Sequence, residues 1–228
     1  MTIKYHNDLV QGSDEWFAAR VGLLTASEMK LIITPSNLKP ASNDKERAHL
    51  YELLAQRITG YVEPQYISDD MLRGTTDEID ARALYSKTYA PVTECGFITN
   101  DQWGFTLGYS PDGVVGDDGL IECKSRRQRF QVETIIKGGM PDDYLIQAQT
   151  GLLVSGRKWL DFVSYSAGLP MVTIRVLPDE AVQRAIVEAA GVFEEMLSVL
   201  RLKYEDQGSL LSLIPTERKP INNGEIEV

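Results

Sequence analysis

Apolar residues recur at helical spacing in several parts of the chain, most clearly near its C-terminal end. Between residues 179 and 204 they fall every three or four positions, which is the period of one helix face. That face carries Val182, Ile186, Ala189, Phe193, Met196 and Leu200. Asn43 and Glu46 have the spacing of a helix-capping pair, and the helix that they begin should end at Gly60. It should bury Leu50, Leu53, Leu54 and Ile58.

Further helices are predicted at 14–20, 77–89, 128–137 and 142–155. Thr25 and Glu28 form a second capping pattern, so a helix should begin at Thr25 and continue through Ile33. The middle of the chain changes to the patterns of strands and tight turns. Strands are expected at 92–99, 103–109, 120–124, 160–166 and 171–177, with a turn at 116–119.

This order of elements predicts an α/β protein with a central mixed β-sheet flanked by helices. We expect a single domain over residues 1–207 and a weakly structured C-terminal tail over residues 208–228. Hydrophobic residues make up 43% of the 228 positions and charged residues 25%, which are ordinary values for a globular protein. No apolar run approaches the roughly 20 residues that a membrane helix needs, and the first residues do not resemble a signal peptide. We therefore expect a cytoplasmic protein without a membrane partner.

Charge and the scarcity of metal-binding side chains narrow the function further. The formal net charge of −10 argues against a protein that coats nucleic acid nonspecifically, although it allows a local basic groove. The chain has only two cysteines and two histidines, too few for a thiolate zinc site. Catalysis, if present, must therefore rest on carboxylates, lysines and arginines.

The most suggestive polar cluster lies between residues 108 and 124. Glu122 and Lys124 flank Cys123 on a predicted strand, so they share one face while Cys123 points to the other. With Asp112 they supply two carboxylates and an ammonium group, which could bind a divalent ion such as Mg²⁺ and support phosphodiester hydrolysis. The alternative is a hairpin with a solvated Glu122–Lys124 salt bridge.

A second candidate site would bind an anion. The predicted helix start at Thr25, with Ser27 beside it, would present free N–H groups, and Arg20 could add a forked phosphate contact. The alternative is a simple helix cap with Arg20 in a surface ion pair.

Basic residues also cluster after the candidate catalytic strand, against a single nearby acid, Glu133. They indicate either a basic groove beside the site or a solvated helix face. Met71 and Leu72 could enter DNA between base pairs or pack in the core. The basic cluster comprises Lys124, Arg126, Arg127, Arg129 and Lys137.

Several of these segments together resemble one known family. Pro111-Asp112 followed by Glu122-Cys123-Lys124 resembles the PD-(D/E)xK nuclease superfamily. The whole chain more narrowly resembles the lambda exonuclease family of YqaJ-like phage recombination nucleases, over about residues 13 to 165. The landmarks are residues 20–28 (RVGLLTASE), Gly74 to Arg82 (GTTDEIDAR), Ser110 to Lys124, and 144–149 (YLIQAQ). One departure is Arg73, where the family often has tryptophan.

The resemblance implies a function and its partners. Family members digest one strand of linear duplex DNA from its 5′ end, need Mg²⁺, form a ring of three subunits and work with a single-strand annealing protein. It therefore implies a PD-(D/E)xK nuclease fold and a Mg²⁺-dependent 5′→3′ exonuclease, with Mn²⁺ as a possible substitute. It also implies a homotrimer that acts on double-stranded DNA ends, leaves 3′ single-stranded tails for recombination, and comes from a phage or prophage in a bacterial host.

The resemblance assigns roles to individual residues. Asp112, Glu122 and the backbone carbonyl of Cys123 would bind the metal, and Lys124 would act on the attacking water. Glu78 would add an acidic group near the metal, and Gln147 would lie near the site. The pocket for the 5′-phosphate would include Arg20 and Ser27. Two alternatives stay open: a PD-(D/E)xK endonuclease of restriction or repair type, and a DNA-end-binding module without catalysis.

Overall fold

Two four-stranded sheets form the centre of the molecule. The computed structural model describes residues 2–64 and 68–218. The first sheet has the order β1-β5-β6-β2, formed by Ile3–His6, Phe97–Asn100, Leu107–Tyr109 and Leu24–Thr25. The second has the order β10-β9-β8-β7, formed by Val172–Val176, Trp159–Tyr165, Gly119–Ser125 and Gly113–Val115. Each sheet is mixed, because β2–β6 and β8–β9 are parallel pairs and the remaining pairs are antiparallel. A separate two-stranded hairpin joins β3 (Ile33–Thr34) to β4 (Lys39–Pro40).

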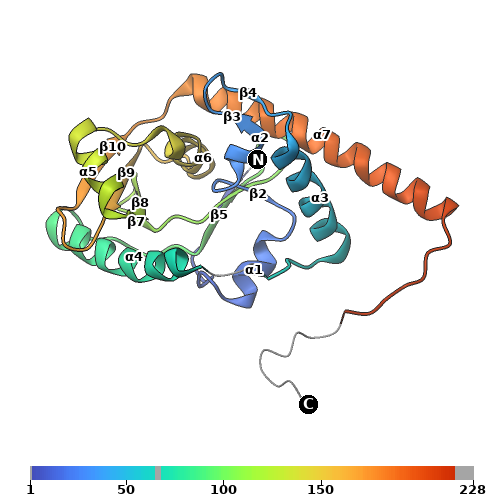
Figure 1. Ribbon diagram of the computed structural model, residues 1–228, viewed down its shortest axis with the longest axis horizontal. Helices are drawn as coiled ribbons and strands as arrows, with labels where there is room; N and C mark the ends of the chain where they lie inside the picture. The colour runs from blue at the N-terminus through green and yellow to red at the C-terminus, as the bar shows by residue number, and fades with distance from the viewer. Residues whose placement is uncertain (1, 65–67, 219–228) are drawn as a thin grey trace, which may run out of the picture.

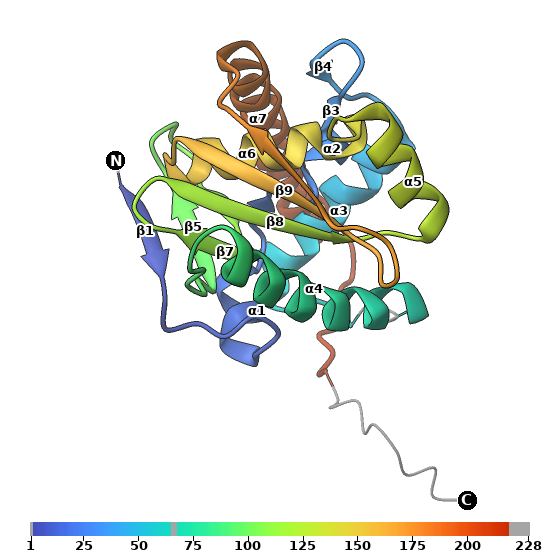
Figure 2. The ribbon, with the colours of Figure 1, turned by 90° about the vertical axis from the view of Figure 1, so that its left-hand side faces the viewer.

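Seven α-helices surround these sheets in the described part of the chain. In Figure 2, β8 and β9 lie between α4 (Asp69–Thr88) on one side and α6 (Leu145–Ser155) with α7 (Glu180–Leu210) on the other. Figure 1 shows that α7 runs along one edge of the molecule and projects beyond α3 at its C-terminal end. The other helices are α1 (Asp14–Arg20), α2 (Met29–Ile32), α3 (Asp44–Thr59) and α5 (Gln128–Lys137), with a short 3-10 turn at Asp142–Tyr144. No helix among the described residues is long and apolar enough to span a membrane.

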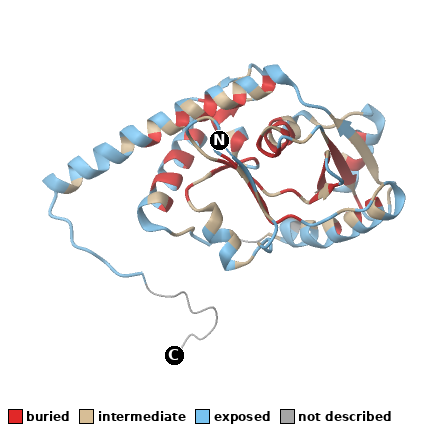
Figure 3. Cartoon of the chain, turned by 180° about the vertical axis from the view of Figure 1, so that it is seen from behind, coloured by how far each residue is buried: buried red, intermediate tan, exposed pale blue. Residues whose placement is uncertain are grey.

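The apolar core has two parts, one on each side of the second sheet. The larger part fills the space among the sheets, α2, α3, α6 and α7, and the buried residues concentrate there in Figure 3. The smaller part lies between α4 and the sheet, where Ala81 and Tyr85 pack against Ile121, Cys123 and Val163. The smaller cluster sets the position of α4 against the strand that carries Glu122.

The predicted α/β class with flanking helices is confirmed, and several predicted elements agree closely with the structure. Helices at 14–20 and 128–137 have the predicted bounds. The Asn43 side chain accepts hydrogen bonds from the Lys45 and Glu46 N–H groups and caps α3 as predicted. The 116–119 turn joins β7 to β8, and Gly116 adopts a φ of 51° there, a left-handed conformation that favours glycine. The division at residue 207 stays a prediction. The last ten residues of the predicted tail lie outside the described residues.

Other expectations were wrong. The helix predicted from residue 77 begins at Asp69, so Met71 and Leu72 lie within α4, where they are 51% and 58% exposed and not in the core. Ile58 is 39% exposed, because it lies near the end of α3 beyond the packed face. The strands β1 and β7 were not predicted.

The predicted helix start at Thr25 was also wrong. Thr25 belongs to β2, where it pairs in parallel with Gly108 of β6, and α2 begins only at Met29. The Thr25 hydroxyl donates to the Glu28 carboxylate at 2.8 Å, whereas a capping hydroxyl would accept a backbone N–H. Pairing with β6 therefore prevailed over the local capping pattern, and the four-residue α2 provides no helix terminus for an anion.

Candidate active site

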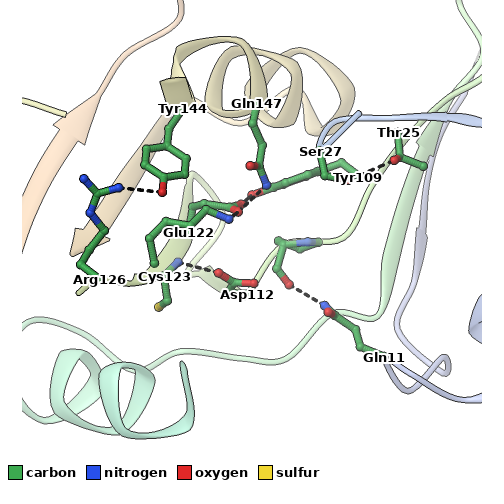
Figure 4. Close-up of polar contacts among 12 residues, drawn as sticks. Gln11, Thr25, Ser27, Tyr109, Asp112, Glu122, Cys123, Arg126, Tyr144 and Gln147 are labelled. Carbon is green, nitrogen blue, oxygen red and sulfur yellow. Dashed lines mark hydrogen bonds and ion pairs between the residues drawn. The ribbon is translucent and has the colours of Figure 1, made fainter. Parts of the chain in front are cut away.

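Glu122 stands at the centre of a buried polar cluster (Figure 4). Its Oε1 accepts hydrogen bonds from Lys124 Nζ at 2.7 Å and from Gln147 Nε2 at 2.5 Å. Its Oε2 accepts the Tyr109 hydroxyl at 2.7 Å. The Glu122 side chain is only 3% exposed and that of Lys124 is 23% exposed, so their ion pair is not the solvated salt bridge of the alternative interpretation.

Asp112 reaches the same cluster from the link between β6 and β7. Its Oδ2 accepts the backbone N–H of Cys123 at 2.5 Å, which holds the carboxylate against β8 (Figure 4). Gln11 supports the link because its side-chain amide donates to the Pro111 carbonyl at 2.8 Å. Arg82 of α4 donates to the Asp112 carbonyl at 3.3 Å. Hydrogen bonds from three parts of the chain thus fix the position of Asp112.

Strand alternation separates Cys123 from its neighbours as predicted. Its side chain packs with Ala81 and Tyr85 in the smaller core cluster, away from Lys124. Burial, followed by the nearby Asp112 carboxylate, raises the pKa of the Cys123 thiol above its ordinary value. The thiol is therefore uncharged at neutral pH, and only the backbone of Cys123 is available to the site.

The carboxyl groups of the cluster disfavour one another's ionised forms. Burial raises the pKa of Asp112 well above its usual range, and the Glu122 and Glu78 carboxylates raise it further. Burial also raises the pKa of Glu78, which lies on α4, while Arg82 opposes that shift. For Lys124, burial alone lowers the pKa, but Glu122 and Asp112 outweigh it and hold the pKa above its ordinary value. Lys124 is thus a cation at neutral pH.

This donor set suits a hard divalent cation. Mg²⁺ is usually bound by one or two carboxylates, with water completing its coordination. Among the described residues, no three or more His, Cys, Asp or Glu side chains form a group that could hold a metal. Asp112 and Glu122 would supply two carboxylates and Cys123 a backbone carbonyl. This is the small number of protein ligands that Mg²⁺ usually has. Burial and the neighbouring carboxylates raise the pKa of Asp112, and an added positive charge would stabilise its ionised form.

The structure brings most of the predicted catalytic residues together. Gln147, on the first turn of α6, hydrogen bonds directly to Glu122. Glu78 lies on α4, and its charge interacts with those of Glu122 and Lys124 on β8. Their catalytic roles remain predictions.

Arg20 lies near the end of β6, beside Ser110, for which no role was predicted. Its Nη1 donates to the Ser110 hydroxyl oxygen at 2.9 Å, and its guanidinium lies 4.2 Å from the centre of the Trp16 ring. Burial lowers the pKa of Arg20, and the Glu28 carboxylate opposes this shift. Ser27 is exposed and lies 3.3 Å from Thr25 Oγ1 through its own hydroxyl oxygen. Arg20 is therefore a partly buried arginine, and among the described residues it does not form the surface ion pair of the alternative interpretation.

Some of the basic residues that follow Glu122 lie beside the active-site cluster, and others lie on the exposed surface of α5. Arg126 lies beside the cluster, and its Nη1 donates to the Tyr144 hydroxyl at 2.8 Å (Figure 4). Arg127 is the N-cap residue of α5. Arg129 and Lys137 are exposed on α5, where Lys137 pairs with Glu133 at 2.6 Å. Only part of the predicted basic cluster thus adjoins Glu122 and Lys124.

Four further residues of the site were missed by sequence reasoning: Ser110, Tyr109, Arg82 and Tyr144. Ser110 and Tyr109 stand directly before Pro111-Asp112, and their proximity in the chain was an available signal. Arg82 lies one helical turn after Glu78, which places the two on one face of α4. Tyr144 was visible only as the first residue of a family landmark.

Fold and site together define the class of the protein. A β-hairpin that carries Asp112 before its first strand and Glu122 and Lys124 on its second, between flanking helices, is the PD-(D/E)xK nuclease fold. A family model described as the YqaJ-like viral recombinase domain matches residues 15–158. The chain therefore belongs to this family, the lambda exonuclease family that its sequence resembles. A search of the curated proteins found no match.

Solved structures give the same result. The chain is 34% identical to an alkaline exonuclease (LHK-Exo) from Laribacter hongkongensis, with a TM-score of 0.77, over 88% of this chain and 100% of that one. The structure of LHK-Exo in complex with dAMP matches over the same shares of the two chains, also at 34% identity, with a TM-score of 0.78. A phage-related exonuclease from Haemophilus somnus 129PT is 16% identical over 78% of this chain and 96% of that one, with a TM-score of 0.52, and shares the fold.

Proposed function

We propose that this protein is a Mg²⁺-dependent exonuclease that digests one strand of linear double-stranded DNA from its 5′ end. The observation that carries the proposal is the convergence of Asp112, Glu122 and Lys124 in one buried cluster. Family membership and the likeness to an alkaline exonuclease support the assignment to nucleases that act on DNA. The product would be a duplex with 3′ single-stranded tails, the substrate for recombination by strand annealing.

The chain's own residues divide the work of hydrolysis. Asp112, Glu122 and the Cys123 carbonyl would hold Mg²⁺, or Mn²⁺ in its place, and the bound ion would neutralise charge on the scissile phosphate and make water more acidic. Lys124 would orient the attacking water and stabilise the negative charge that develops on phosphate oxygens. Gln147 would keep Glu122 oriented through the hydrogen bond between them.

The 5′ polarity requires a group that recognises the strand end. Arg20 and Ser110 lie together at the end of β6, one residue away from Pro111-Asp112. A 5′-terminal phosphate bound there, with Ser27 at the rim, would place the first internucleotide phosphate toward Asp112. Arginine suits this role because its guanidinium can make two parallel hydrogen bonds to one phosphate.

One assay tests the proposal against its two alternatives. Linear and closed-circular duplexes of the same sequence are incubated with and without Mg²⁺. We expect digestion of the linear duplex alone, only with Mg²⁺. Cleavage of the circle would instead indicate an endonuclease. Binding to linear ends without digestion under any metal condition would indicate a DNA-end-binding module.

The assembly belongs to the same proposal. A homotrimer would enclose the undigested strand, and a single-strand annealing protein would receive that strand as it emerges. Basic residues near the site, in a chain of net charge −10, support a DNA path confined to one part of the surface.

A further inference from the structure

A cationic cavity lies beside the active-site cluster, between α4 and the start of α5. Its volume is about 360 Å³, within the range of pockets that bind small molecular groups. Three arginines and one aspartate line it, so its charged side chains sum to a positive charge. The lining residues that matter are Arg73, Asp77, Arg126, Arg127, Gln128 and Ser166.

The carboxylate in this cavity is already engaged. Asp77 accepts the Ser125 hydroxyl at 2.5 Å and lies 3.8 Å from Arg73 Nε. Arg73 also donates to the Ser125 hydroxyl oxygen at 3.1 Å. Asp77 and Ser125 therefore fix Arg73 at the wall of the cavity. Arg73 stands where the family often has tryptophan, and here it supplies a guanidinium group.

Arg126 is held just as firmly. Its backbone N–H donates to the Tyr165 carbonyl at 2.7 Å, and its Nη1 donates to the Tyr144 hydroxyl at 2.8 Å. The guanidinium carbon lies 5.1 Å from the centre of the Phe130 ring. A cation that is fixed before binding loses less conformational freedom when an anion arrives.

One aromatic ring links the cavity to the catalytic lysine. The centre of the Tyr144 ring lies 5.4 Å from the guanidinium carbon of Arg126 and 5.6 Å from Lys124 Nζ. The separation between the Arg126 guanidinium carbon and Lys124 Nζ is thus at most the sum of these two distances. Successive phosphates of a duplex strand rise about 3.4 Å along the helix axis, so this separation spans only a few nucleotides.

We propose that this cavity binds an internucleotide phosphate of the DNA, a few nucleotides away from the phosphate at Lys124. A phosphodiester carries one negative charge and accepts forked hydrogen bonds, which arginine provides better than lysine. Two sources share this chemistry, the duplex ahead of the active site and the single-stranded tail behind it. The inference rests on the proposed function for the identity of its ligand as DNA.

The test is the salt dependence of DNA binding, measured with the full chain in a chelating buffer so that no hydrolysis occurs. The probes are a 5′-phosphorylated blunt duplex and the same duplex with a 3′ single-stranded tail. Arg127→Ala is the main variant, because the Arg127 side chain is exposed and lines the cavity. Arg126→Gln is the second variant. Arg201→Ala is the matched control, an exposed arginine on the distant end of α7 (Figure 1).

The slope of log Kobs against log salt concentration is negative, and each lost phosphate contact makes it less steep, by about 0.9 for duplex DNA and about 0.7 for a single strand. We expect Arg127→Ala and Arg126→Gln to make the slope less steep by about this amount, and Arg201→Ala to leave it unchanged. An equal effect on both probes would assign the phosphate to the duplex, and an effect on the tailed probe alone would assign it to the tail.

Slopes for both cavity variants equal to that of Arg201→Ala on both probes would overturn the proposal. That outcome is separable from a failure of the proposed exonuclease. Digestion of linear DNA by the wild-type protein together with unchanged slopes would remove the cavity site alone. Less steep slopes for the two cavity variants, with no digestion by the wild-type protein, would contradict the proposed exonuclease and support the phosphate site.

Discussion

Lys124 is the residue whose loss distinguishes a catalytic cluster from a structural ion pair. Its ammonium contacts Glu122 and is held as a cation by two carboxylates. Removal of one group that stabilises a transition state costs on the order of 10²–10³ in rate. We expect Lys124→Ala to lower the initial rate of digestion of linear duplex DNA by at least that factor, and Asp112→Ala and Glu122→Ala to do the same. DNA binding and the circular dichroism spectrum should be retained.

Activity near the wild-type level in Lys124→Ala would mean that the Glu122–Lys124 pair only stabilises the fold. Lys158→Ala is a suitable control, because Lys158 pairs with Asp118 in an exposed ion pair at the other end of β8.

The raised pKa of Asp112 makes the free energy of unfolding of the metal-free protein depend on pH. Its pKa is raised in the folded state, chiefly by burial, above its unfolded value of about 3.9. The folded state then binds more protons than the unfolded state between these two values, so its stability falls as pH rises through that range. We expect Asp112→Asn to raise the free energy of unfolding at pH 7 in chelating buffer, while digestion is lost.

Urea unfolding of both proteins at pH 4 and pH 7 measures this effect. The difference between variant and wild type should grow with pH, because only the wild type loses a proton there. A difference that is the same at both pH values would show that the ionised Asp112 is not strained in the folded protein.

Arg20 tests how the strand end is recognised. A terminal phosphate carries more negative charge than an internal one, and Arg20 with Ser110 is the paired contact at the end of β6. We expect Arg20→Ala to slow digestion of 5′-phosphorylated duplexes strongly and of 5′-hydroxyl duplexes much less. Initial rates on duplexes that differ only in the 5′ group measure this. Equal losses on both substrates would make Arg20 a structural residue or a general DNA contact.

At the scale of elements, α4 depends on a buried network for its position. The Tyr85 hydroxyl donates to Asp161 Oδ2 at 2.6 Å, and Arg175 binds the same carboxylate with two hydrogen bonds. Tyr85 and Asp161 are 1% and 3% exposed. A hydrogen bond to a charged group contributes about 1.5–3 kcal/mol, so Tyr85→Phe should lower the free energy of unfolding by about that amount.

Chemical denaturation measures that change, and Tyr89→Phe is its control. Tyr89 is the C-cap residue that follows α4 and is 57% exposed, so the loss of its hydroxyl should have little effect. If the two variants were equally stable, the bond between Tyr85 and Asp161 would contribute nothing measurable.

Local signals predicted the elements that they control. The caps of α3 and the turn at Gly116 depend on neighbouring residues, and both were found as expected. The strand at Thr25 was missed because its partner, β6, lies more than 80 residues away in the chain. The three-residue β7 shows too little alternation to be predicted, and it forms by pairing with β8 and, at Val114, with Thr93.

The candidate site divides in the same way. Glu122 and Lys124 could be placed on one face by strand alternation alone. The contacts from Tyr109 and Gln147 to Glu122 join residues 13 and 25 positions away, and no spacing rule predicts them. The resemblance to a family placed Gln147 near the site, whereas Ser110 and Arg82 stood at the ends of family landmarks without a predicted role.

At the scale of the whole molecule, the net negative charge of the chain must be compatible with the proposed binding of DNA. A ring of three subunits that directs its basic residues inward would separate the two. We expect light scattering at micromolar concentration to give three times the 25.5 kDa of one chain. The mass should persist at moderate salt if apolar contacts contribute to the assembly. A mass of one chain would contradict the trimer.

Trp16 gives the Arg20 site an optical property. Its indole N–H donates to the same Ser110 hydroxyl that Arg20 contacts, and its ring lies under the guanidinium. The emission of an indole depends on nearby charge and on its hydrogen bonds, and both would change if an anion drew Arg20 away. The chain has two other tryptophans: Trp103, which packs against Phe105, and Trp159, whose ring lies under Arg175. The fluorescence of Trp16 would therefore report the binding of a strand end at Arg20, so that binding could be followed without an attached dye.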